Sequence, residues 1–314
     1  MTGNRQLIKG AICGVAAGSC WGVIFLGPVL APGVSGTGFA VLRFLCYGLF
    51  SLILLLPRGR KVWAQLNRTD WVALFWLSLI GNLLYYSLVG IGVQQVGVGT
   101  TSLIVGLIPV LVTLAGRRDA NAVALSRLLP SLCCASAGVV LISLHAMTGD
   151  PAGGDSRVGL LCAFGALISW SWYAVRNARH LALTQVSSHD WALLSGVMTG
   201  AQSLLLVLPV FGTQLNSEGL RLLLDPLLVA AGVAALASVI GGALWNQASR
   251  LLPLALSGQV LVIETLMALL LGFLWEQRLP TLQESVAIGL LLVGVMWCLR
   301  CHQPARTGAV HEHA

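Results

Sequence analysis

Long apolar stretches follow one another along the chain, separated by short breaks that are polar or rich in glycine and proline. A helix needs about 20 mostly apolar residues to cross the hydrocarbon core of a bilayer. Apolar stretches of that length predict membrane-spanning helices. Ten of them are present, at residues 10–30, 36–56, 71–89, 98–114, 128–147, 158–174, 191–211, 226–248, 253–275 and 282–299.

The breaks between these stretches are too short to hold a separate soluble domain. PGVSGT separates the first two stretches, and the brief turn QQVG separates the third from the fourth. The start MTGNRQLIKG is not expected to be a cleaved signal, because the first apolar run already has the length of a span and no small-residue cleavage site precedes a polar region.

Composition supports a membrane protein. Of the 314 residues, 57% are hydrophobic and only 9% are charged, and the mean hydropathy is +0.86. Soluble domains carry about 25% charged residues and could not keep such a surface in water. The sequence therefore predicts an all-α integral membrane protein with ten transmembrane helices.

The positions of lysine and arginine predict the orientation. If both termini are cytoplasmic, fourteen of the 18 basic residues lie on the inner side, Arg157, Arg221 and Arg278 lie outside, and Arg43 lies within the membrane. Inner loops carry an excess of lysine and arginine, so this bias favours ten spans in a bacterial-type inner membrane with both termini inside. The net charge of +7 then reflects topology and contact with anionic lipid, and it requires no nucleic-acid partner.

The two halves of the chain resemble each other. GAICGVAAGSCWG aligns with GLLCAFGALISWS at an offset of 149 residues, which pairs Trp21 with Trp170, and later spans align at an offset of 156. Five spans in each half would insert the second half upside down, as in transporters whose inverted repeats frame a site near the midplane. We expect two five-helix repeats, 1–149 and 150–302, and a disordered cytoplasmic tail, 303–314.

The cysteines predict neither disulfides nor a metal site. Seven of the eight lie within predicted spans, where thiols pack as small apolar groups. Cys298 and Cys301 precede His302, His311 and His313, a combination that could suggest zinc. Cys298, however, falls in the last turn of a predicted span. The residues between His302 and His311 also do not resemble a compact zinc finger, so we expect no metal.

Several motifs resemble the drug/metabolite transporter superfamily, specifically its EamA-type exporters. They are Arg43 in the second span, the GLIPVLVTLAG run, and the ending LLGFLWEQRLPTLQESVAIGLLLVGV. The resemblance covers nearly the whole chain, and GNLLYYSLVGIGVQ looks most like the YddG-like branch, which exports aromatic amino acids or metabolites. It implies ten helices and efflux from the cytoplasm. Glu276 and Gln283 occupy the family's C-terminal pattern, whereas Trp275 replaces its usual glycine and Thr265 its frequent proline.

Aromatic and amide side chains recur within the spans. Asn82, Tyr85 and Tyr86 stand at i, i+3 and i+4, so an α-helix projects them to one side. Ligand pockets combine apolar walls with a few polar groups, although interfacial belts and contacts between helices also use such residues. The expected substrate-binding residues are Trp21, Arg43, Asn82, Tyr85, Tyr86, Trp170, Tyr173, Trp245 and Asn246.

Tryptophans at the ends of predicted spans are expected in the interfacial belts. Trp71, Trp191 and Trp275 occupy such positions. Amphipathic rings favour the headgroup level of the bilayer, where one edge is apolar and the other wet.

Arg43 and Glu264 lie near the middle of predicted spans. A charge at that depth costs about 2.5–3.5 kcal/mol on insertion scales, so it usually meets a partner or lines a polar pathway. Three roles stay open. The two residues form an ion pair, they bind the carboxylate and amine of a zwitterion separately, or Glu264 is a proton site coupled to export.

Small residues and proline point to packing and bending. Gly10, Gly14, Gly18 and Gly22 form a stripe in the first span, which predicts close approach of another helix, with a bending element as the alternative. Pro109 is a candidate hinge in the fourth span, since it removes a helical hydrogen bond.

Together these patterns predict a secondary transporter that exports small metabolites, amino acids or related amphipathic compounds, by alternating access. Efflux of lipophilic cations is the alternative cargo class, since aromatic rings and Glu264 suit cations. We expect no enzyme, because the paired aspartates and histidine boxes of membrane enzymes are missing, and no cofactor, because no Walker motif occurs. The expected partners are a small-molecule substrate and the lipid bilayer, and a homodimer through the fifth and tenth spans stays open. A passive channel is disfavoured, because channels usually surround a pore with several copies.

Overall fold

The computed structural model describes residues 2–115, 125–148, 156–212, 217–252 and 261–301. The expected tail and its histidines, and the first residues of the ninth predicted span, lie outside these ranges. Helices account for nearly all of the described chain, and these ranges contain no strand. The longer helices are α1 (Thr2–Gly22), α3 (Gly36–Leu55), α5 (Arg68–Trp76), α6 (Tyr85–Val105), α7 (Ile108–Ala115), α8 (Leu125–Thr148), α9 (Ser156–Leu181), α10 (Ser188–Phe211), α12 (Leu224–Val233), α13 (Gly242–Leu251), α15 (Val262–Trp275) and α16 (Leu282–Cys301). Shorter ones are η1 (Val23–Leu26), α2 (Gly27–Leu30), α4 (Gly59–Trp63), η2 (Leu77–Leu84), α11 (Ser217–Leu222) and η5 (Ala234–Gly241).

Within the described ranges, six helical stretches are long and apolar enough to cross a membrane, which confirms the prediction of an all-α, multi-span protein. Three shorter apolar helices lie within α8, α15 and α16. The count of ten spans and the inverted relation of the two halves stay predictions. The six stretches are Arg5–Leu30, Gly36–Leu55, Arg68–Val112, Ser156–Leu181, Ser188–Phe211 and Leu224–Leu251.

The stretch Arg68–Val112 contains a break at Gly97. It has 45 residues, and an unbroken helix of that length would extend roughly 65 Å, about twice the thickness of the hydrocarbon core. Gly97 has φ of 82° and ψ of 168°, a conformation that glycine adopts without a steric penalty. The break falls in QQVG, where the sequence predicts a turn.

Polar caps extend several helices beyond the apolar runs that predict them. Asn67 Oδ1 accepts a hydrogen bond from the Asp70 backbone N–H, and Asp70 Oδ2 accepts one from the Asn67 N–H, which forms a capping box. Helix α5 therefore begins at Arg68, before the apolar run. In the same way Ser187 accepts from the Asp190 N–H and caps α10.

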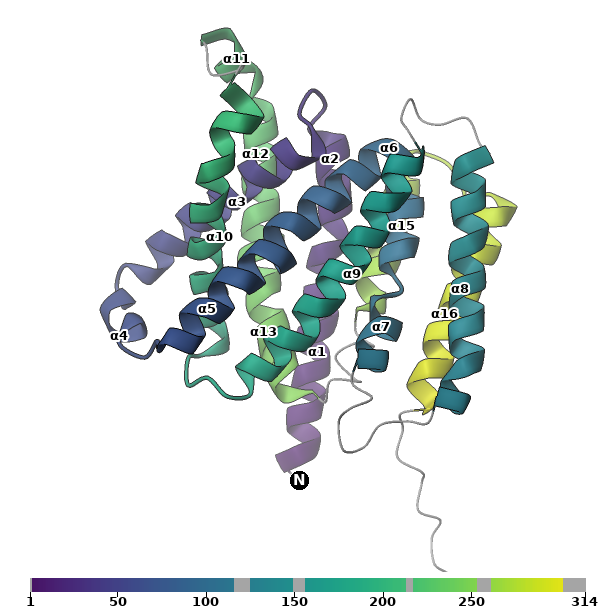
Figure 1. The fold of residues 1–314 in the computed structure, drawn as a ribbon, viewed down its shortest axis with the longest axis horizontal. Helices are drawn as coiled ribbons and strands as arrows, with labels where there is room; N and C mark the ends of the chain where they lie inside the picture. Colours follow the sequence, from purple (N-terminus) through teal and green to yellow (C-terminus); the bar gives the residue numbers. More distant parts are fainter. Residues whose placement is uncertain (1, 116–124, 149–155, 213–216, 253–260, 302–314) are drawn as a thin grey trace, which may run out of the picture.

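The helices pack in pairs that join distant parts of the chain. Helix α3 lies against α10, α6 against α9, and α8 against α16. Helices α8 and α16 stand side by side at one edge of the bundle (Figure 1). Helices α3 and α10 meet where Gly48 faces Gly200. A Cβ added to either glycine would lie within 2.8 Å of the other's Cα, so the two backbones touch.

Helix α1 runs between α13 and α15 and uses its glycines for close contact. A Cβ on Gly22 would lie 2.4 Å from the Met267 Cβ, and one on Gly10 would lie 2.8 Å from the Leu252 side chain. The predicted close packing is therefore confirmed at both ends of the stripe. Pro109 is the second residue of α7, after a break at residues 106 and 107, where its missing N–H costs no helical hydrogen bond.

Two eight-residue stretches, η2 and η5, are wound as π-helix. They begin at Leu77 and Ala234, 157 residues apart, almost the offset at which these parts of the two halves align. π-Helical turns are rare, and they recur at functional sites. Their presence at matching positions supports the predicted repeat.

A side chain from the opposite half of the chain donates a hydrogen bond to a carbonyl in the middle of each π-helical stretch. Ser169 Oγ donates to the Ile80 carbonyl at 2.6 Å, and Trp21 Nε1 donates to the Ala237 carbonyl at 2.9 Å. Ile80 and Ala237 occupy the same place in their stretches, the fourth residue of each. The Ile80 carbonyl also accepts the backbone N–H of Tyr85, so the Ser169 hydroxyl adds a second hydrogen bond to it.

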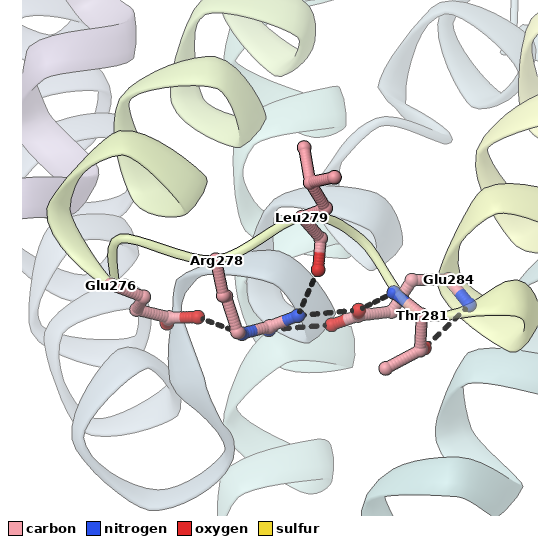
Figure 2. A network of polar contacts seen from close by, with 5 residues as sticks. All are labelled: Glu276, Arg278, Leu279, Thr281 and Glu284. Atoms are coloured by element: carbon pink, nitrogen blue, oxygen red, sulfur yellow. Dashed lines mark hydrogen bonds and ion pairs between the residues drawn. The ribbon is translucent and has the colours of Figure 1, made fainter.

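Arg278 fixes the connection between α15 and α16 (Figure 2). Its guanidinium donates to Glu276 at 2.6 Å and to both carboxylate oxygens of Glu284 at 2.7 Å, while Glu284 also accepts from the Thr281 N–H. The hydrogen bond to Glu284, followed by that to Glu276, raises the pKa of Arg278, which therefore stays charged. Gln283 is exposed beside this network, so the C-terminal family pattern lies at a helix end.

Candidate functional site: a central cavity between the helices

A cavity of about 30 Å³ lies where α1, α3, α6, α9, α10 and α13 meet the two π-helical stretches. Seven of the nine predicted binding residues border it, while Tyr85 and Trp245 lie behind its wall. A buried water needs about 10–15 Å³, so the cavity has room for about two, whereas ligand pockets measure about 300–1,000 Å³. The cavity seen here is therefore too small for a metabolite. The lining residues are Trp21, Arg43, Phe44, Tyr47, Asn82, Tyr86, Trp170, Tyr173, Ala192, Ser195, Ala237, Ser238, Gly242 and Asn246.

Arg43 supplies a buried positive charge to this cavity. Its side chain is 2% exposed, and its Nε and Nη2 donate to Ser238 Oγ at 3.1 and 3.0 Å. The guanidinium carbon lies 4.0 Å from the centre of the Tyr86 ring, in cation–π geometry. Among the described residues, no carboxylate forms an ion pair with Arg43.

Three indole rings form the aromatic wall. Trp21, Trp170 and Trp245 lie within 5.4 to 5.7 Å of one another, centroid to centroid, and come from α1, α9 and α13. Such spacings are typical of tilted and edge-to-face aromatic pairs. The indole N–H of Trp245 is buried without a hydrogen-bond partner among the described residues.

Asn82, Tyr85 and Tyr86 do not share one face as an α-helix would arrange them. Asn82 and Tyr86 reach the cavity, where Asn82 donates to Thr199 Oγ1 at 3.0 Å. Tyr85 packs between Tyr86 and Trp170, and its hydroxyl is buried with no partner in the described chain. Asn82 lies in the π-helical stretch η2, whose wider turn changes the angle between positions i and i+3.

Asn246 borders the cavity, but its amide also connects three helices. Its Oδ1 accepts from Asn177 Nδ2 at 3.1 Å, and its Nδ2 donates to the Ser188 carbonyl at 3.3 Å. Trp191 Nε1 donates to Asn177 Oδ1 at 3.0 Å. Trp191 is 1% exposed, so the prediction that it belongs to an interfacial belt is wrong. Its indole N–H has a partner within the bundle, whereas Trp275 is 52% exposed, as a belt residue should be.

Asp70 and His180 extend this network and were missed by sequence reasoning. Asp70 Oδ1 lies 2.7 Å from His180 Nε2, and the imidazole stacks on Trp191 with 4.7 Å between ring centres. Asp70 could have been found as the third helical residue after Asn67, the spacing of a capping box. Its partner could not, because His180 is 110 residues away.

Glu264 lies at the start of α15, 5% exposed and outside the cavity lining. It forms no ion pair with Arg43, and the described residues offer no hydrogen bond to its carboxylate. In this conformation the two groups do not touch, although the charge of Arg43 still acts on the Glu264 carboxyl through space. The roles predicted for both stay predictions.

The position of Tyr86 leads to a first prediction. Replacing Tyr86 with alanine removes the ring beneath the Arg43 guanidinium, so we expect transport to fall roughly tenfold while insertion is unchanged, since buried aromatic and cation–π contacts each contribute about 0.5–2 kcal/mol. Export from proteoliposomes measures the effect. Trp71→Ala is the control, because that ring is 39% exposed. Equal rates for Tyr86→Ala and the unaltered protein would assign Tyr86 to packing alone.

Comparisons with known proteins agree with this architecture. Residues 8–144 match the sequence pattern of the EamA-like transporter family. The inner membrane protein YtfF of Escherichia coli (strain K12) is 32% identical across an alignment of 310 positions, which spans 94% of this chain and 96% of that protein. A solved chain described as "Crystal structure of protein" has a similar fold, with a TM-score of 0.65 and 18% identity over 92% of this chain and 96% of that one.

Proposed function

Because the chain belongs to the EamA-like transporter family, we propose that it is a secondary transporter of the inner membrane that exports amino acids, aromatic ones among them, and related amphipathic carboxylates. The proposed mechanism is alternating access, in which two inverted five-helix repeats move against each other around the central cavity. Both termini would be cytoplasmic, as the distribution of arginine and lysine favours.

The single observation that carries the proposed cargo is the environment of Arg43. A guanidinium has five N–H donors, and Ser238 occupies only some of them. A buried charge without a counter-charge is costly, and a carboxylate pairs with a guanidinium through two parallel hydrogen bonds. A substrate carboxylate in the cavity would therefore supply the missing negative charge.

The aromatic wall would contact the apolar part of an amphipathic solute. The indoles of Trp21 and Trp170 border the cavity, and the rings of Tyr85 and Trp245, whose polar atoms have no partner in the described chain, pack against them. Separation of the walls would make these two groups available to a bound solute. The opposite cargo, a lipophilic cation, would meet the positive charge of Arg43 in the same space, and Glu264 lies outside the lining.

The geometry also offers places where the helices can bend. The π-helical stretches η2 and η5 both contribute to the cavity wall, and bends in helices are commonly found at such turns. The break at residues 106 and 107, before Pro109, is a third position. Bending at these points would allow the cavity to enlarge from its volume of about 30 Å³.

Transport by everted membrane vesicles tests the proposed cargo. We expect vesicles that contain the protein to accumulate labelled phenylalanine or tyrosine and to exclude a lipophilic cation such as ethidium. Accumulation of the cation, without any amino acid, would replace this proposal with multidrug efflux.

Glu264 is proposed as the proton-coupling group. Three acidic residues are buried in or beside the described apolar helices, and two of them have basic partners, Asp70 with His180 and Glu284 with Arg278. Glu264 has none among the described residues, and a membrane carboxyl that meets water on opposite sides of the membrane in two conformations can carry a proton across.

This assignment predicts that Glu264→Gln retains substrate exchange but loses transport driven by a proton gradient. Exchange and gradient-driven export in the same proteoliposomes separate the two activities. Glu276→Gln is the control, since Glu276 lies at a helix end away from the cavity. Gradient-driven export at the rate of the unaltered protein would remove Glu264 from the mechanism.

A further inference from the structure

A second cavity, of about 320 Å³, lies between α5 and α9 and shares no lining residue with the central cavity. We propose that this groove, which we call the α5–α9 groove, binds one anionic phospholipid. Its volume is within the range of about 300–1,000 Å³ that ligand sites occupy. It is thus large enough for the glycerol backbone and the first part of the acyl chains.

The wall of the groove is mainly apolar. Val72 and Trp76 contribute from α5, Leu77 follows them, and Trp172 faces them from α9. Val72 and Trp76 are 53% and 48% exposed, so the groove opens onto the outer surface of the bundle. In an apolar helix of spanning length, that surface faces lipid chains.

Two arginines give one end of the groove a positive charge. Arg176 and Arg179 are three residues apart on α9, so they lie on one face of the helix, and both border the cavity. The Arg176 guanidinium lies 6.0 Å from the centre of the Trp172 ring, which places it beside the apolar wall. Guanidinium groups bind phosphate through paired hydrogen bonds, and basic pockets between transmembrane helices bind anionic headgroups.

The position of the groove along the membrane agrees with this occupant. Arg176 and Arg179 belong to the last two turns of α9, and the neighbouring groove residue Thr69 belongs to the first turn of α5. The proposed orientation places these helix ends at the inner leaflet, which holds a negative surface potential. That assignment to a leaflet rests on the proposed function, whereas binding of the lipid does not.

Lipid binding to the full chain in detergent tests the proposal by native mass spectrometry. We expect phosphatidylglycerol to bind at least tenfold more tightly than phosphatidylcholine. Arg176→Gln with Arg179→Gln should weaken phosphatidylglycerol binding roughly 30-fold, since each basic residue near anionic lipid contributes about fivefold, and should leave phosphatidylcholine unchanged. The control is Arg60→Gln with Lys61→Gln, two exposed basic residues of α4 that do not line the α5–α9 groove.

Two further measurements keep the proposal falsifiable if the double arginine variant folds poorly. Ala73→Trp fills the groove without changing its charge, and it should weaken phosphatidylglycerol binding to a similar extent. A photoactivatable phosphatidylglycerol on the unaltered protein should label peptides that contain residues 72–77 and 172–183.

Equal affinity for the two lipids, equal losses in the groove and α4 variants, or labelling elsewhere would overturn the proposal. A dimer that Ala73→Trp dissociates, with lipid binding unchanged, would assign the groove to a second copy of the chain. Because none of these readouts measures transport, they fail or succeed independently of the proposed cargo.

Discussion

Replacing Arg43 with glutamine is expected to reduce exchange of phenylalanine at least about 100-fold, with little loss of folded protein. Truncating one partner of a buried, hydrogen-bonded charge pair costs about 2–5 kcal/mol, and each 1.4 kcal/mol is a factor of ten. The folded protein tolerates the change because Arg43 has no protein carboxylate to leave unpaired among the described residues. Counterflow in proteoliposomes measures the exchange rate, and thermal melting in detergent measures stability.

Arg43→Lys separates charge from geometry. Lysine keeps the positive charge but lacks the planar fork that binds a carboxylate with two bonds, so we expect partial activity with weaker apparent affinity. Arg60→Gln, on the exposed surface of α4, serves as the control. A normal exchange rate in Arg43→Gln would mean that the buried charge is structural and that the carboxylate binds elsewhere.

Gly200→Leu should prevent the protein from folding. The backbones of α3 and α10 touch at Gly48 and Gly200, and a Cβ at position 200 would already lie 2.7 Å from the Gly48 Cα. Overpacked cores lose about 1–3 kcal/mol when side chains can adjust, and here the obstacle is backbone, so we expect a larger loss. The yield of monodisperse protein after detergent extraction, and its melting temperature, measure the effect.

Gly232→Leu is the matched control for this substitution. Gly232 is exposed on α12, and a Cβ there meets no atom within 4 Å. We expect it to extract and melt like the unaltered protein. If Gly200→Leu behaved the same way, the close crossing of α3 and α10 would not hold the two halves together.

The positions of the helices could be predicted from the sequence because the bilayer fixes the length of an apolar run. The observed helix α3, for example, begins at the predicted Gly36 and ends one residue early at Leu55. Polar first turns escaped the prediction, since a hydropathy pattern excludes residues such as Asp70 that cap a helix at the interface. The π-helical stretches η2 and η5 escaped it as well, because their residues read as an ordinary apolar helix.

The cavity was partly predictable, since aromatic and amide residues deep within spans have few reasons to face lipid. Seven of the nine expected residues border it. Tyr85 does not, because the prediction assumed an unbroken α-helical face. Trp191 was misjudged since its position at a span end gives no sign of its bond to Asn177, and the Asp70–His180 pair depends on packing between helices that are distant in sequence.

The central claim is that the cavity recognises a carboxylate through Arg43. Counterflow by the unaltered protein with two matched solutes, phenylalanine and phenylethylamine, tests it most directly, because they share the aromatic ring and the amine and differ only in the carboxylate. We predict that proteoliposomes loaded with phenylalanine exchange labelled phenylalanine and that labelled phenylethylamine does not enter above the rate of empty liposomes. Exchange of phenylethylamine at the rate of phenylalanine would contradict the account.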